Sequence, residues 1–106
     1  MEVNRLEVWL VNLDPTIGSE IRKTRPAVIV SPDELNEHLA TVIVVPLTTG
    51  RSYPFRMKTK VRGKDGVAAI DQLRTVDKQR LVKKIDVLSQ HDGESLLKSL
   101  GELFTL

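Results

Sequence analysis

The apolar residues of this chain come in short runs that are separated by turn-forming residues. Residues 7–13, 27–30, 41–47 and 85–88 are such runs, and Asp14-Pro15 and Lys64-Asp65-Gly66 are turn signals. Residues 55–61 alternate strictly between basic and apolar side chains, which is typical of a half-buried strand. We expect a returning strand over residues 67–70 after a hairpin turn at 64–66. This pattern predicts a mostly β structure.

Two segments have the features of helices. Ser31 can cap a short helix in which Pro32 takes the first position, Glu34 bonds back to the cap, and His38 lies near the end. A C-terminal helix is predicted after a cap at Ser89 or Asp92. Its apolar face comprises Leu96, Leu97, Leu100, Leu103 and Phe104. We expect this face to pack in the core or in a dimer. Asp77 can cap one further helical turn.

The number and order of these elements fit one domain over residues 1–106. Six or seven short strands and one terminal helix in a chain of 106 residues favour a small closed barrel with a helix across it. The longest apolar run is far below the roughly 20 residues of a transmembrane helix, and the polar N-terminus does not resemble a signal peptide. We therefore expect a cytoplasmic protein without membrane contact.

The charged residues are segregated along the chain. Residues 51–64 hold six basic residues and no acid, whereas residues 86–106 hold four acids and one lysine, although the whole chain is only +2. A basic patch attracts a polyanion. The alternating Arg56, Lys58, Lys60 and Arg62 either protect an edge strand or contact a nucleic-acid backbone. The adjacent Tyr53 and Phe55 either stack on bases or belong to the core.

Residue usage argues against several kinds of chemistry. The chain has no cysteine, which excludes disulfides, cysteine zinc sites and thiol nucleophiles. Its two histidines, His38 and His91, lie in separate segments, so a nuclease with paired imidazoles is disfavoured. The carboxylates show no metal-ligand spacing. We expect neither a metal nor another cofactor.

A polar loop before residue 26 is the strongest candidate for a phosphate site. Arg25 precedes Pro26, which forces its backbone into an extended conformation, and it adjoins the most apolar run. A guanidinium anchored in this way can clamp a phosphate. The segment VVPLTTG, which contains Thr48, ends another expected strand.

Several motifs in order resemble those of the MazF/PemK toxin family. They are LDPTIGSE, RPAVIVSP, VVPLTTG, YPF and GVAAIDQLRTVDKQR, followed by the leucine-rich helix, and they cover nearly the whole chain. The resemblance implies a barrel of the CcdB/PemK type, related to SH3 barrels, that forms a homodimer. It also implies a toxin that cleaves single-stranded RNA through the ribose 2′-OH, leaving 2′,3′-cyclic phosphate and 5′-OH ends. The implied partner is an antitoxin with an acidic, disordered C-terminal tail.

The resemblance also implies roles for individual residues. Arg25 and Thr48 match the catalytic arginine and threonine, and Glu20 is the candidate for proton removal or for orienting Arg25. The expected RNA-binding residues are Ser19, Gln72, Asp71, Arg22, Lys23, Tyr53, Phe55, Arg56 and Lys58. The chain departs from many relatives at residues 21–23, where Ile, Arg and Lys make the loop more basic. It has Ala69 where some relatives have an arginine that works with an aspartate, here Asp71.

Two other functions remain open from the residues. One is a gyrase poison on the same barrel, as in CcdB, and the other is a nucleic-acid-binding barrel without catalysis. The pairing of Arg25-Pro26 with Thr48-Thr49 favours the nuclease.

Overall fold

A computed structural model describes all 106 residues as one antiparallel sheet of seven strands with two helices. The strands are β1 (Glu7–Asn12), β2 (Thr24–Ile29), β3 (Thr41–Thr48), β4 (Arg56–Val61), β5 (Lys64–Ala69), β6 (Arg74–Asp77) and β7 (Leu81–Val87). The helices are α1 (Asp33–His38) and α2 (Gln90–Leu103), and η1 (Ile70–Gln72) and η2 (Lys78–Arg80) are single 3-10 turns. The predicted mostly β fold is confirmed.

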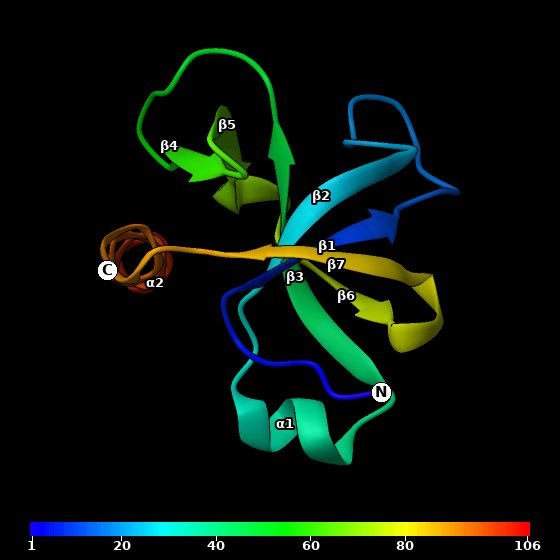
Figure 1. The fold of residues 1–106 in the computed structure, drawn as a ribbon. Coiled ribbons are helices and arrows are strands. Elements are labelled where there is room, and N and C mark those ends of the chain that lie inside the picture. Colours follow the sequence, from blue (N-terminus) through cyan, green and yellow to red (C-terminus); the bar gives the residue numbers. More distant parts are fainter.

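The long strand β3 organises the sheet. The strand order is β4-β5-β3-β2-β1-β7, and β6 pairs with the first half of β3 while β5 pairs with its end. The sheet curls into a half-barrel, with α1 at one end of the molecule and the β4–β5 hairpin at the other (Figure 1).

The expected closure of the barrel is not made by strand pairing, because β4 and β7 remain edges. Carboxylates bridge this gap instead. Asp86 of β7 accepts the Arg62 N–H at 2.6 Å, and Asp92 of α2 accepts the Lys60 N–H at 3.2 Å and the Thr59 hydroxyl at 3.0 Å. These contacts satisfy backbone donors that a closing strand would otherwise bind.

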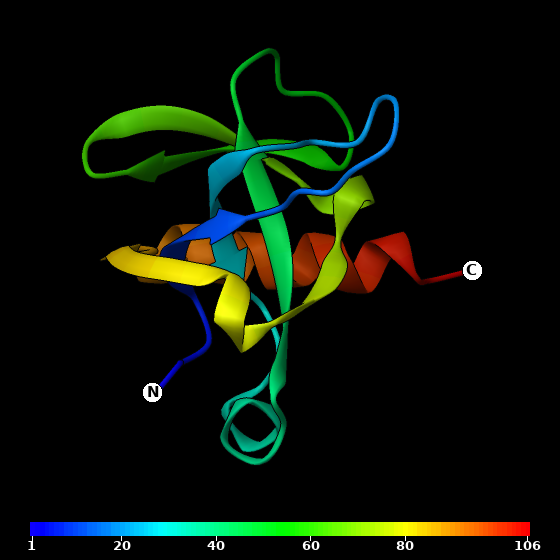
Figure 2. The same ribbon diagram turned by 90° about the vertical axis from the view of Figure 1, so that its right-hand side faces the viewer.

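Apolar side chains cover both faces of the central strands. Ile29 and Val44 belong to one buried cluster, and Val28 and Val45 belong to the other. This explains the continuous apolar runs, since strands buried on both faces do not alternate with polar residues. Helix α2 crosses behind the sheet (Figure 2) and completes the second cluster with Leu96, which is fully buried. No helix is long and apolar enough to span a bilayer.

Several local predictions are confirmed. Residues 41–47 form β3, and Ser89 caps α2 by accepting the Asp92 N–H at 3.1 Å. Asp77 caps η2 through the Gln79 N–H at 2.8 Å. Of the predicted apolar face of α2, Leu96, Leu100 and Leu103 pack against the second cluster, whereas Leu97 is only half-buried and Phe104 does not join them. Phe104 follows the last helical residue and is exposed.

The predicted cap of α1 is wrong. Pro32 takes the N-cap position and no side chain caps the helix. The buried Ser31 hydroxyl instead donates to Asn36 Oδ1 at 2.5 Å and accepts the Ile43 N–H at 3.0 Å. A buried hydroxyl requires partners, and here they tie α1 to β3.

The predicted hairpin turn is displaced by two residues. Val61 pairs with Lys64, so Arg62 and Gly63 form the two-residue turn, and both have positive φ, 52° and 76°. A type I′ turn requires positive φ at both of its central residues, and Gly63 adopts such a φ without strain. The Asp65-Gly66 pair lies inside β5.

Candidate functional site

The second strand begins earlier than the sequence predicted, so Arg25 lies inside β2 rather than in the preceding loop. Pro26 has no N–H, and the pairing between β2 and β3 ends at Ala27 and Pro46. Continuing that register by two residues sets Arg25 opposite Thr48. Side chains at opposite positions of antiparallel strands point to the same face.

One groove of about 430 Å³ contains two of the three predicted catalytic side chains, Arg25 and Thr48. It lies where β2 begins and β3 ends, next to the β4–β5 hairpin. Its lining residues are Arg25, Pro26, Leu47, Thr48, Thr49, Val61, Arg62, Lys64, Asp65, Gly66 and Ile85. We call it the Arg25 groove. Three cationic side chains line it beside one carboxylate, so it suits an anionic ligand.

Arg25 is available for such a ligand. The chain has two salt bridges, Arg56–Asp71 and Lys84–Glu7, and Arg25 takes part in neither. Its side chain is half-buried at the end of a rigid strand. A guanidinium held this way can donate two parallel hydrogen bonds to a phosphate.

Four other predicted residues line a separate groove of about 560 Å³. Ser19, Glu20, Asp71 and Gln72 meet there, between the β1–β2 loop and η1. Gln72 Oε1 accepts the Ile21 N–H at 2.6 Å, so Gln72 holds the loop in place. We call this the Gln72 groove.

Glu20 therefore does not lie beside Arg25 in this chain. Its carboxylate accepts the Ile17 N–H at 2.6 Å and lines the Gln72 groove. The predicted contact in which Glu20 orients Arg25 is not made within one protomer.

Arg56 belongs to a small cluster rather than to an open row of cations. Its Nε and one terminal nitrogen donate to the two oxygens of Asp71 at 2.5 and 2.8 Å, and its Cζ lies 5.6 Å from the centre of the Tyr53 ring. The hydrogen bonds from Arg56 hold the pKa of Asp71 below its usual value. Lys58 is exposed on the same face of β4.

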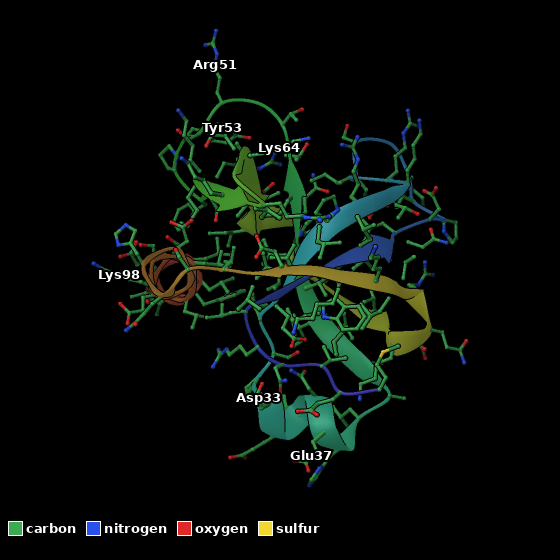
Figure 3. The ribbon with its side chains drawn as sticks, in the orientation of Figure 1. Asp33, Glu37, Arg51, Tyr53, Lys64 and Lys98 are labelled. Atoms are coloured by element: carbon green, nitrogen blue, oxygen red, sulfur yellow. The ribbon has the colours of Figure 1, made fainter.

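The two aromatic residues before β4 are exposed. Tyr53 is 56% and Phe55 39% accessible, which decides against the core for both. Figure 3 shows Arg51 and Tyr53 on the β3–β4 loop, at the end of the molecule opposite Asp33 and Glu37. Phe55 has a positive φ of 64°, an unfavourable conformation for a bulky side chain.

The remaining predicted residues, Arg22 and Lys23, are exposed on the β1–β2 loop. The sequence placed Arg62 in the alternating basic row with a possible nucleic-acid contact and Lys64 only in the basic run over residues 51–64, and it predicted neither beside Arg25. Their place in the groove depends on how the hairpin folds over β2. No group of three or more histidine, aspartate or glutamate side chains is close enough to hold a metal ion.

The structure is similar to those of known toxins. A MazF from Deinococcus radiodurans superposes with a TM-score of 0.87 at 23% identity, over 100% of this chain and 99% of that one. A mycobacterial endoribonuclease, solved in complex with its cognate antitoxin, gives 0.79 at 22%, over 94% and 92%. Mycobacterium tuberculosis MazF-mt6 gives 0.75 at 22%, over 92% and 95%.

The sequence itself matches a family model. Residues 4–104 match the model described as PemK-like, MazF-like toxin of type II toxin-antitoxin system. Because the match covers nearly the entire chain, this protein belongs to the PemK-like, MazF-like family of type II toxins.

Proposed function

We propose that this toxin is a metal-independent endoribonuclease that cleaves single-stranded RNA at specific short sequences. The observation that carries the proposal is the presence of Arg25 and Thr48 in one groove with a positive lining. The similar mycobacterial protein is described as an endoribonuclease, which supports the same class of reaction.

The proposed reaction uses the substrate's own hydroxyl as nucleophile. The 2′-OH attacks the neighbouring phosphorus, the bond to the 5′ oxygen breaks, and the products carry a 2′,3′-cyclic phosphate and a 5′-OH. The 2′-OH loses a proton and the leaving oxygen gains one. The requirement for a 2′-OH distinguishes RNA from DNA.

Arg25 supplies charge stabilisation in this reaction. The five-coordinate transition state carries more negative charge on phosphorus oxygens than the ground state, and a fixed guanidinium binds it more tightly. Arginine remains protonated at neutral pH, so it is a poor proton acceptor. Thr48 donates its hydroxyl to a phosphate oxygen or holds the 2′-OH.

Glu20 is the proposed proton acceptor, and it lies in the other groove of the same chain. A homodimer in which the Gln72 groove of one protomer adjoins the Arg25 groove of its partner would bring them together. Ser19, Gln72 and the exposed Tyr53 and Phe55 would then contact RNA on either side of the cut.

The proposed protein partner is an antitoxin with an acidic, disordered C-terminal tail. Three cations in the Arg25 groove and the exposed Arg22 and Lys23 form a surface to which such a tail is complementary. The similar mycobacterial and Deinococcus toxins have been solved with their antitoxins.

A labelled RNA incubated with the protein and EDTA tests the proposal. We expect cleavage with cyclic-phosphate ends, loss of cleavage in Arg25→Ala with an unchanged circular dichroism spectrum, and no cleavage at a site whose 5′ nucleotide lacks the 2′-OH. Cleavage by Arg25→Ala at the wild-type rate would refute the site. RNA binding without cleavage would indicate a nucleic-acid-binding module. If the protein neither binds nor cleaves RNA but traps gyrase on DNA, it is a gyrase poison.

A further inference from the structure

The tip of the β4–β5 hairpin brings two cations into the Arg25 groove that the proposed mechanism does not use. Arg62 is the first residue of the tight turn and Lys64 begins β5, and both side chains line the groove with Arg25 and Thr48. The labelled Lys64 lies beside the end of β3 in Figure 3. These cations come from a segment far from β2 in the sequence.

The hairpin tip is held in place over the groove. Asp86 of β7 accepts the Arg62 N–H at 2.6 Å, and this bond helps keep the pKa of Asp86 below its usual value. The turn itself is rigid, with two residues and positive φ at both. A fixed hairpin presents its cations at a constant distance from Arg25, which a flexible loop would not.

The charge of the groove exceeds what one phosphodiester needs. Arg25, Arg62 and Lys64 carry +3 and Asp65 carries −1, so the lining residues sum to +2, and Asp86, whose carboxylate attracts the Arg62 charge, does not line the groove. In the ground state the scissile phosphodiester carries one negative charge, so +1 of the lining stays uncompensated while the strand is bound. A second phosphodiester of the same strand would balance it.

We propose that Arg62 and Lys64 bind the phosphate adjacent to the scissile one and so fix the position of the RNA strand relative to Arg25. The inference rests on the proposed function. Backbone contacts position a nucleic acid without reading its bases. Arg62 and Lys64 are therefore positioning residues, and the sequence preference must come from other contacts.

The experiment uses an RNA with one mapped cleavage site, made uncleavable by a single 2′-deoxy sugar at the cut. A methylphosphonate, which removes the negative charge, replaces each phosphate next to the scissile one in turn. We expect it to weaken wild-type binding by about tenfold at one of the two positions. The double variant Arg62→Gln/Lys64→Gln should bind the unmodified RNA more weakly and show no further loss with the methylphosphonate.

Lys60→Gln is the matched control, because Lys60 is on the same hairpin but does not line the Arg25 groove. It should retain the full methylphosphonate effect. The slope of log K against log salt should fall by about 0.7 for each lost contact in Arg62→Gln and Lys64→Gln. RNA binding is also measured for the two single variants, so that a folding defect in the double variant is not mistaken for the loss of a phosphate contact.

Two outcomes would overturn the inference, and they are distinguishable. If the double variant loses the same factor as wild type with the methylphosphonate, the hairpin does not contact that phosphate, whereas the nuclease proposal stands. If wild type neither binds this RNA without a methylphosphonate nor cuts the same RNA with every 2′-OH present, the proposed function fails and the inference fails with it.

Discussion

At the scale of the residue, one proline determines where the proposed catalytic arginine lies. Pro26 cannot donate to a neighbouring strand, and the β2–β3 pairing ends at Ala27. The backbone on either side stays extended, because proline restricts the residue before it. Arg25 and Thr48 thus lie beyond the end of the β2–β3 pairing, where their side chains line a groove, while Arg25 stays paired with Val11 of β1 and Thr48 with Val67 of β5.

Thr48 tests whether this geometry supports the proposed chemistry. Thr48→Val keeps the shape and removes the hydroxyl, and we expect the single-turnover cleavage rate to fall about 100-fold, as for loss of one donor at a transition state. Thr48→Ser keeps the hydroxyl and should retain most of the rate. If both variants cleave equally well, the threonine acts through packing and not through its hydroxyl.

Glu7 is the one buried charged side chain of the protein. Burial raises its pKa, but the Asn4 N–H at 2.9 Å, the Trp9 indole at 3.0 Å and Lys84 at 3.0 Å outweigh burial and lower it. Glu7→Gln weakens these charge-assisted bonds, and we expect a loss of about 1–3 kcal/mol in the free energy of unfolding by urea. Glu94→Gln, an exposed position on α2, should change it by less than about 0.5 kcal/mol.

The sequence predicts the identity of site residues better than their contacts. Arg25 and Thr48 follow from an X-Pro motif, a strand end and a family resemblance, and the structure places them in one groove. The pairing of Arg56 with Asp71 joins residues 15 apart whose approach depends on the β4–β5 register. No local pattern in the sequence contains that information.

At the scale of the element, caps and apolar periodicity predict a helix or strand well where the element has a clear pattern of its own. The structure confirms the capping signal at Ser89 and, at Leu96, Leu100 and Leu103, the apolar face of α2. Strand β6 was not predicted, because four residues with one buried side chain give no periodic pattern. Most of β7 was missed for a similar reason: it is an edge strand with several exposed side chains.

The short element η1 joins both loops beside the Gln72 groove. Asp71 binds Arg56, which lies at the end of the β3–β4 loop, while the next residue, Gln72, holds the β1–β2 loop through Ile21. We expect Asp71→Asn to raise the Kd for RNA and to increase amide exchange in residues 49–55. The stability change should stay within about 1 kcal/mol, because the pair is partly exposed.

The charge-reversed pair Arg56→Asp/Asp71→Arg is the control for this prediction. It restores an ion pair in the opposite sense and should recover part of the loop protection that each single change removes. If the double variant exchanges as fast as the worse single variant, the ion pair does not hold the loop.

At the scale of the whole molecule, three carboxylates add side-chain contacts between elements of the open half-barrel. Glu7 links β1 to the N-terminal segment and to β7, Asp71 links η1 to β4, and Asp86 links β7 to the β4–β5 hairpin. Each has its pKa below the usual value.

This arrangement predicts how stability depends on pH. A carboxylate whose pKa is lower in the folded state contributes stability above its unfolded pKa, and that contribution is lost as pH falls through the folded value. Tm should therefore be nearly constant at neutral pH and fall steeply below about pH 4.

The variant Glu7→Gln/Asp71→Asn/Asp86→Asn should have a lower Tm at pH 7, but its Tm should fall by less between pH 7 and pH 3 at fixed ionic strength. The remaining loss reports repulsion among the 16 basic residues as the other carboxylates are neutralised. Parallel Tm curves for the variant and the wild type would show that these three carboxylates do not govern acid stability.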